Sequence, residues 1–369
     1  MITSRNLSSI ARRLMRQPAA PYFEHAVRAE VEAICEENRL RFRRDEFGNV
    51  IVRFNAGPAS TRPLVLAAHM DHPGFEVVAG KSNGKWNVRF HGGVPDQFFR
   101  RGVRLRLLPQ GLPATLGPRV GTVKQFQFRT AGPLKIRPRF AVWDLEDFAI
   151  RSSRIHGRSC DDLIGVATIL AVLIELKRKR AKVNVIGLIS RAEEVGLRGA
   201  LAAIGTKTLP GNALVVSLET SRELPGVKMG QGVILRVGDK TSVFDTKAMR
   251  FLAEVCADLQ KQDKRFQFQR GLMSGGTCEA TAFQEFGFQT GAVCVALGNY
   301  HNCGANSRIA AEYIDIDDAR TMAELLVAVA RGMPTFHRRI SKLPMRLEKL
   351  RKEARIRLRK TADPPSNYG

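Results

Sequence analysis

The sequence predicts an α/β protein in which a mixed sheet carries helices on both faces and a small, barrel-like all-β domain is inserted into the chain. Two observations support this fold class. Helical and strand-like segments alternate before and after the middle of the chain, as in a layered α/β fold. Between about residues 81 and 154, short alternating runs are broken by Gly and Pro, which is typical of a small all-β domain. A chain of 369 residues is also longer than one core usually supports.

This fold class divides the chain into four expected segments. Residues 1–78 form the first part of the layered domain, with a helix at 24–40 and strands at 49–54 and 63–71. Residues 79–154 form the inserted β domain, and residues 336–369 form a basic C-terminal tail. Residues 155–335 form the second part of the layered domain. Its helices are expected at 162–179, 196–204, 246–260 and 315–333, and its strands at 182–190, 212–219 and 290–298.

The positive charge is concentrated in two of these segments. The net charge is +24, of which residues 81–160 contribute +12 and residues 336–360 contribute +9. The tail is expected to be a solvated terminal helix that rests on its own domain. The alternative is an electrostatic tether to an acidic partner, RNA or an anionic membrane surface.

The sequence predicts a cytoplasmic protein without a membrane span. The N-terminus has no uninterrupted apolar stretch of the secretory type, and the longest apolar run is too short to cross a bilayer. The cysteines are scattered and form no C-x-x-C pair, which favours reduced thiols over disulfides or a zinc finger. They are Cys35, Cys160, Cys256, Cys278, Cys294 and Cys303.

Histidines and carboxylates follow several of the predicted strands or precede the helix at 162–179. Ligands of open α/β sheets bind outside the carboxyl ends of the strands, so these side chains are expected to meet there. Taken singly, each has an ordinary explanation as a helix cap, a surface turn or a solvated strand end. Taken together, they offer nitrogen and oxygen ligands of the kind that Zn, Co or Mn accepts. The residues are His69, Asp71, Asp161, Asp162, Glu193, Glu194, Glu219 and His301.

The motifs around these residues resemble those of a known enzyme family. In order, they are "HMDHPGF", "DDLIG", "EEVGLRGA", "PGVKMGQG", "SGGT" and "YH". This series resembles the di-metal aminopeptidases of the glutamyl/leucyl aminopeptidase family, some of which form tetrahedral (TET) assemblies. The resemblance extends over roughly residues 20–335. It implies a di-zinc exopeptidase-like catalytic domain interrupted by a β domain that helps oligomerisation, and hence a homo-oligomer.

The resemblance also implies a role for each site residue. Asp161 would bridge two divalent metal ions, which are Zn or possibly Co or Mn. The remaining ligands would be His69 and Glu219 at the first metal, and Glu194 and His301 at the second. Glu193 would act as general base, and Asp71 would orient His69. The implied activity is removal of N-terminal residues from peptides.

Three positions depart from the family pattern. Glu219 stands where the family usually has Asp, although the longer side chain can still bind a metal. Cys278 replaces an Asp in "SGGTDA", so any polar role there is lost or moves to Glu279. His72 and Pro73 replace the "EI" of "HMDEIG", and His72 is expected at the surface or behind the ligands rather than as a further ligand.

Two alternative functions remain at this point. A related di-metal amidohydrolase or deacylase, acting on N-acyl amino acids or small amides, would use the same site. A nucleic-acid-associated protein would explain the charge, since basic surfaces bind nucleic acid in a salt-sensitive way. However, the basic segments lack the interleaved aromatic residues of single-strand binding platforms, and no helix-turn-helix or zinc-finger signature is present.

Overall fold

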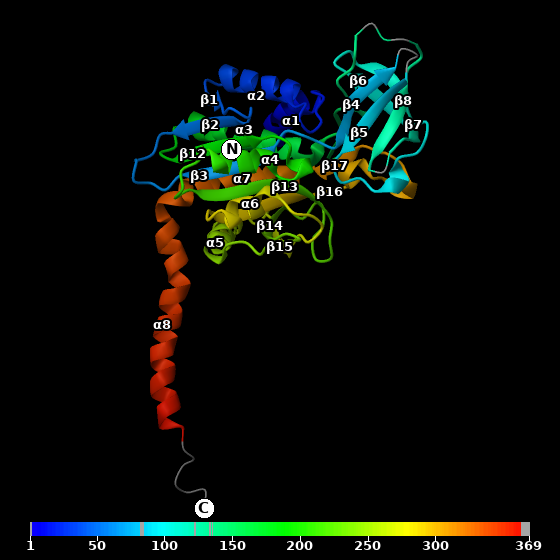
Figure 1. The fold of residues 1–369 in the computed structure, drawn as a ribbon. Coiled ribbons are helices and arrows are strands. Elements are labelled where there is room, and N and C mark those ends of the chain that lie inside the picture. Colours follow the sequence, from blue (N-terminus) through cyan, green and yellow to red (C-terminus); the bar gives the residue numbers. More distant parts are fainter. Residues whose placement is uncertain (1, 82–84, 122, 133, 135, 363–369) are drawn as a thin grey trace, which may run out of the picture.

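The predicted α/β fold is confirmed by the computed structural model, which describes residues 2–81, 85–121, 123–132, 134 and 136–362. Its main sheet has eight strands (Figure 1). The central strands β12, β3, β13 and β16 are parallel, and antiparallel neighbours flank them on both sides, so the sheet is mixed. In spatial order the strands are β1 (Arg41–Arg44), β2 (Val50–Asn55), β12 (Asn184–Ser190), β3 (Leu64–His69), β13 (Leu214–Arg222), β16 (Gln289–Leu297), β14 (Val233–Gly238) and β15 (Phe268–Leu272).

Helices cover both faces of this sheet because successive strand residues point to opposite sides. On β3, Leu64 and Leu66 belong to one apolar core, while Val65 and Ala67 belong to another. The first core includes side chains of α1 (Ser4–Met15), α2 (His25–Glu37), α3 (Cys160–Arg178), α5 (Thr246–Gln262) and α7 (Ile316–Gly332). The second includes side chains of α4 (Arg198–Gly205) and α6 (Glu279–Glu285).

The inserted segment contains a closed barrel with its own aromatic core (Figure 1). Phe75 packs edge-on against Phe90 and Trp143 inside it. In order around the barrel, the strands are β4 (Gly74–Lys81), β5 (Lys85–His91), β8 (Gln125–Arg129), β7 (Leu112–Arg119), β6 (Arg104–Leu108) and β9 (Phe140–Trp143).

The strand pairing differs from the segment boundaries expected at residues 79 and 154. The barrel strands begin earlier, at Gly74, and end earlier, at Trp143. Residues after the barrel pair elsewhere, because β10 (Ala149–Arg151), β11 (Arg154–Gly157) and β17 (Glu312–Asp315) form a separate sheet. Short 3₁₀ turns complete the chain: η1 (Asp96–Phe98), η2 (Glu193–Val195), η3 (Tyr300–Asn302), η4 (Ala305–Ser307) and η5 (Met333–Thr335).

The basic tail forms helix α8 (Phe336–Lys360), but it does not rest on the domain as expected. Only its beginning is attached: Phe336 is buried, and Arg339 forms an ion pair with Asp258 of α5. Residues 341–360 are all exposed, and the helix extends away from the body on the side far from the barrel (Figure 1). Among the described residues, none of the helices has the length and apolar character needed to cross a membrane.

Candidate metal centre

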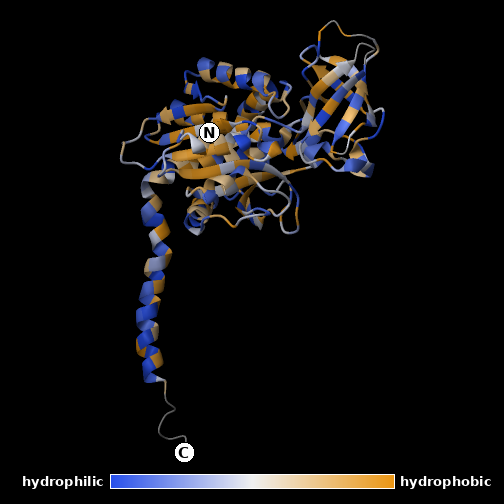
Figure 2. Ribbon diagram, in the orientation of Figure 1, coloured by the Kyte–Doolittle hydropathy of each residue, from blue (hydrophilic) through white to orange (hydrophobic). Residues whose placement is uncertain are grey.

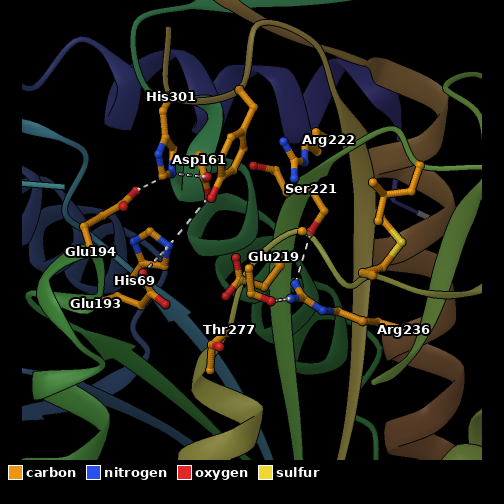
Figure 3. A pocket seen from close by; sticks show the side chains of 16 residues that line it. His69, Asp161, Glu193, Glu194, Glu219, Ser221, Arg222, Arg236, Thr277 and His301 are labelled. Atoms are coloured by element: carbon orange, nitrogen blue, oxygen red, sulfur yellow. Dashed lines mark hydrogen bonds and ion pairs between the residues drawn. The ribbon is translucent and has the colours of Figure 1, made fainter. Parts of the chain in front are cut away.

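The predicted site residues meet at the carboxyl ends of the central parallel strands (Figure 3). His69 is the last residue of β3, and Glu219 lies on β13. Asp161 lies at the start of α3, where its peptide bond to Asp162 is cis. The remaining residues lie on turns that follow strands: Glu193 and Glu194 are in η2 after β12, and His301 is in η3 after β16.

Asp161 lies between the two histidines. Its Oδ1 is 3.6 Å from His69 Nε2, and its Oδ2 is 3.5 Å from His301 Nε2. His301 Nε2 is also 3.1 Å from Glu194 Oε1. Two groups of potential ligand atoms therefore share Asp161, and within each group the atoms lie within 4.8 Å of one another. One group is His69, Asp161 and Glu219, and the other is Asp161, Glu194 and His301.

The carboxylates of these groups fit divalent metal ions. Asp161, Glu194 and Glu219 each have a buried oxygen, respectively Oδ1, Oε1 and Oε1, that makes no hydrogen bond within the described residues. Buried carboxylate oxygens without hydrogen bonds are costly, and coordination to a metal removes that cost. The donors are imidazole nitrogens and carboxylate oxygens, a set suited to Zn, Co or Mn. A third group of potential ligands, His69 with Glu193 and Glu194, overlaps the other two.

The pKa shifts of the site residues, without metal, reflect the same contacts between histidines and carboxylates. Burial lowers the pKa of His69, but the carboxylates of Asp161 and Asp71 outweigh this and raise it well above its usual value. Burial opposes a proton on His301 too, yet the carboxylates of Glu194 and Asp161 raise its pKa. Burial raises the pKa of Glu219 to about 8. Protons and metal ions would therefore compete for the same atoms.

Asp71 holds the two adjacent glutamates through their backbone. One of its carboxylate oxygens accepts a hydrogen bond from Glu193 N at 2.9 Å, and the other accepts one from Glu194 N at 3.1 Å. Asp71 Oδ1 also lies 3.6 Å from His69 Nδ1. The chain turns sharply here because Ala192 has a left-handed backbone with φ of 51°. This turn lets two neighbouring side chains approach one centre.

A second buried carboxylate, Glu312 of β17, has a similar role that the sequence analysis missed. Glu312 accepts hydrogen bonds from Asp161 N at 3.1 Å and His301 N at 2.8 Å. It therefore ties together the backbones of two predicted ligands. A glutamate that begins a strand is ordinarily solvated, so the only sequence signal was its place after the "YH" motif.

His72 is buried rather than at the surface, which corrects one of the two positions expected for it. Its Nδ1 lies 2.8 Å from the carbonyl oxygen of Asp161, and its Nε2 lies 3.0 Å from Asn302 Oδ1. Burial lowers the pKa of His72. His72 thus links the loops that carry Asp161 and His301.

Asp239 brings a carboxylate to the position where Cys278 replaces the family Asp. Asp239 Oδ2 accepts hydrogen bonds from Cys278 N at 3.0 Å and from Thr281 Oγ1 at 2.6 Å. Glu279 is buried and accepts a hydrogen bond from Ser190 Oγ instead. The backbone at this turn is therefore held by Asp239, whose position along the chain gave no indication of this contact.

A small cavity opens over the candidate metal centre. Its walls include two arginines that the sequence analysis did not single out, Arg222 and Arg236 (Figure 3). Arg236 is buried and donates to Ser221 Oγ at 3.1 Å and to the Gly276 carbonyl oxygen at 3.2 Å. Arg222 is exposed and makes no ion pair or hydrogen bond through its side chain in the described part of the chain.

Solved structures of archaeal peptidases share this fold. An aminopeptidase from Desulfurococcus kamchatkensis matches with a TM-score of 0.73 and 20% identity, over 89% of this chain and 95% of that one. The TET1 peptidase of Pyrococcus horikoshii matches with a TM-score of 0.73 and 20% identity, over 88% and 99%. A TET aminopeptidase from Thaumarchaeota archaeon SCGC AB-539-E09 matches with a TM-score of 0.74 and 18% identity, over 90% and 99%.

The sequence itself matches the family model described as M42 glutamyl aminopeptidase over residues 137–325, which is about half of the chain. The matched region contains the predicted ligands Asp161, Glu194, Glu219 and His301, and His69 precedes it. This match confirms the expected family, and the amidohydrolase and nucleic-acid alternatives are not needed. The chain belongs to the M42 glutamyl aminopeptidase family and is a metal-dependent aminopeptidase.

Proposed function

We propose that this enzyme removes N-terminal residues from peptides with two metal ions, Zn or alternatively Co or Mn, in the groups that share Asp161. His69 and Glu219 would complete one site, and Glu194 and His301 the other. The observation that carries this proposal is that two groups of His and carboxylate ligand atoms share Asp161, and that each of their three carboxylates keeps a buried oxygen without a hydrogen bond in the described residues. When bound, a metal pair lowers the pKa of a water molecule and polarises the scissile carbonyl group.

Glu193 is the general base of the proposed reaction. It lines the cavity, and its Oε2 lies 3.8 Å from His69 Nε2. Burial raises the pKa of Glu193 well above its usual value, and a positioned carboxylate can act as a general base. Glu193 accepts a proton from the attacking water and passes it to the leaving amine. Asp71 keeps the backbone of Glu193 in place for this transfer.

Metal analysis tests this assignment. The purified protein should bind two metal ions per chain and should hydrolyse aminoacyl-p-nitroanilides only when loaded. Glu194→Gln should lose one metal ion, whereas Asp161→Asn should lose both. If Asp161→Asn kept full metal occupancy and Asp162→Asn lost it, the bridging role would belong to Asp162.

The preferred N-terminal residue is acidic in this proposal, because Arg222 provides an unpaired positive charge in the cavity wall. Its guanidinium group lies against Gly275, where a Cβ atom would be 2.8 Å from Arg222 Nε. The close approach therefore depends on glycine. A glutamate or aspartate side chain of the substrate could pair with Arg222 while its scissile bond faces Glu193.

Substrates with a single variable side chain test this preference. Glutamyl-p-nitroanilide contains no carboxylate other than its side chain, so a loss specific to this substrate reports on side-chain recognition. Arg222→Gln should lower kcat/KM for glutamyl-p-nitroanilide by about 10- to 100-fold and leave leucyl-p-nitroanilide nearly unchanged. Arg270→Gln, which changes an exposed arginine outside the cavity, is the control. An equal loss on both substrates would contradict the proposed preference.

The enzyme is proposed to be a cytoplasmic homo-oligomer. The TET1 peptidase of P. horikoshii can assemble into a tetrahedron or a large octahedral shell. The cysteines within the described residues are all free thiols, as is usual in a reducing compartment. We assign assembly to the inserted unit, residues 79–154, between catalytic parts 1–78 and 155–335, with residues 336–369 as a separate tail. A monomer in light scattering would contradict the assembly.

A further inference from the structure

Helix α8 has an apolar stripe that nothing in the described chain covers. Its members recur at spacings of three and four residues, so they fall within about 80° of one another around the helix. The stripe consists of Leu343, Leu347, Leu350, Ala354 and Leu358. Its leucines are 39 to 67% exposed. Two more apolar residues, Met345 and Ile356, lie on the opposite face.

The remaining surface of α8 is strongly cationic. Residues 336–360 contain 11 Lys and Arg against two Glu. Both glutamates are paired within the helix, Glu348 with Arg351 and Glu353 with Lys349. Most of the other cations have no ion-pair partner in the described residues. These are Arg338, Arg346, Lys352, Arg355, Arg357, Arg359 and Lys360.

The position of α8 keeps both faces available. Phe336 packs on Phe251, Arg339 pairs with Asp258, and Lys342 pairs with Glu254, so the body holds only the first turns. The following 18 residues, which would extend about 27 Å, project into solvent (Figure 2). Figure 2 shows the helix as mainly hydrophilic with separated hydrophobic positions.

A second copy of this chain is a poor partner for α8. Of the net charge of +24, residues 336–360 carry +9, which leaves +15 on the rest of the chain. Two copies of the helix would bring like charges together. Of the remaining +15, residues 81–160 carry +12, so the rest of the body is close to neutral and offers no net negative charge to the helix. Charge complementarity therefore requires an anionic partner that is not this protein.

The arrangement of charges around the stripe favours a bilayer over a nucleic acid. At 100° per residue, Arg346 and Arg357 flank one side of the stripe, and Arg351 and Arg355 flank the other. Long cationic side chains beside an apolar stripe can reach lipid headgroups while the leucines enter the acyl boundary. Phosphate contacts alone would leave the leucines exposed.

We propose that α8 is an amphipathic helix that lies on an anionic membrane surface and tethers the peptidase there. The contact is peripheral: the stripe enters the interface, and the flanking arginines bind anionic headgroups. The cytoplasmic leaflet of a bilayer is such a surface. This tether is independent of the catalytic site, because α8 supplies no residue to the cavity.

Vesicle flotation with matched variants tests the tether. The full-length protein should float with vesicles of phosphatidylcholine and phosphatidylglycerol, but not with phosphatidylcholine alone, and added salt should weaken binding. Leu347→Gln with Leu350→Gln should reduce binding at least tenfold. Met345→Gln with Ile356→Gln removes the same number of apolar residues from the opposite face and should have little effect.

A second pair of variants separates membrane binding from binding to any polyanion. Arg346→Gln with Arg357→Gln removes two cations beside the stripe, and Lys352→Gln with Arg359→Gln removes two from the far side. The first pair of substitutions should lower the affinity for anionic vesicles by roughly 10- to 30-fold, and the second pair should lower it clearly less. Equal losses, or tight binding of single-stranded RNA without vesicle binding, would overturn the proposal. Turnover of a small substrate, unchanged in every variant, confirms that each protein is folded.

Discussion

The hydrogen bonds of Glu312 predict that a residue touching neither metal nor substrate controls metal affinity. Both of its oxygens accept backbone N–H groups, from Asp161 at 3.1 Å and from His301 at 2.8 Å. In Glu312→Gln, the amide keeps one acceptor and turns an NH₂ group toward the other N–H. One buried donor is thereby left without a partner, at a cost of about 1–3 kcal/mol.

This free-energy cost destabilises the positions of Asp161 and His301, which both belong to the predicted ligand groups. Metal affinity should therefore fall by about 10- to 100-fold, the range found for partners behind metal ligands. The loss of a negative charge near two cations acts in the same direction. Competition with a chromophoric chelator measures this affinity. At saturating metal concentration, the kcat of Glu312→Gln should return to most of the value of the unsubstituted enzyme.

Asp318→Asn provides a matched control. Asp318 is also buried and also accepts two backbone N–H groups, from Gly230 at 2.7 Å and Gly232 at 2.6 Å, but it does not line the cavity. Both variants should lower the melting temperature, and only Glu312→Gln should weaken metal binding. The reasoning is refuted if the two variants lose similar stability while Glu312→Gln keeps its original metal affinity.

Three further outcomes are expected. Glu193→Gln should lower kcat by about 10²- to 10⁴-fold while metal content stays unchanged, as measured by kinetics and metal analysis of one preparation. Metal binding at pH 7 should release protons, because the raised pKa values of His69 and His301 keep both rings protonated in the metal-free protein. Apparent affinity should then rise as pH increases through neutrality; calorimetry in two buffers of different ionisation enthalpy checks this, and pH-independent binding would contradict it. A chain that ends after Lys342 should retain its turnover of a small substrate.

Much of the fold could be predicted because its long elements have clear periodicity. The helix at α3 and the strands β3, β12, β13 and β16 are almost entirely buried, so their apolar runs identify them. Strands β1 and β15 are short and largely exposed, and no apolar pattern predicts them. The pairing of β11 with β17 could not be predicted either, since it is a contact between distant segments that local pattern does not encode.

The candidate site, like the fold, could be predicted only in part. Residues that follow buried strands could be placed together, because parallel strands deliver their carboxyl ends to one edge of the sheet. Glu312 could not be placed there, because it begins β17, a strand of the separate sheet, and does not follow one of the parallel strands. Arg222 was missed for another reason: it extends β13 just beyond Glu219, where an exposed arginine is ordinary.

The loop that carries His301 depends on such distant contacts because its backbone is unfavourable by itself. Asn299, His301 and Asn302 all have left-handed backbones, with φ of 55°, 54° and 61°. Each costs about 1–3 kcal/mol and persists only where the surroundings hold it. Glu312 holds His301 N, and Asn302 Nδ2 donates to the Arg158 carbonyl oxygen at 2.9 Å. His301 is thus aimed at its carboxylate neighbours before metal binds, so residues that contact no metal are expected to set how tightly the metal is held.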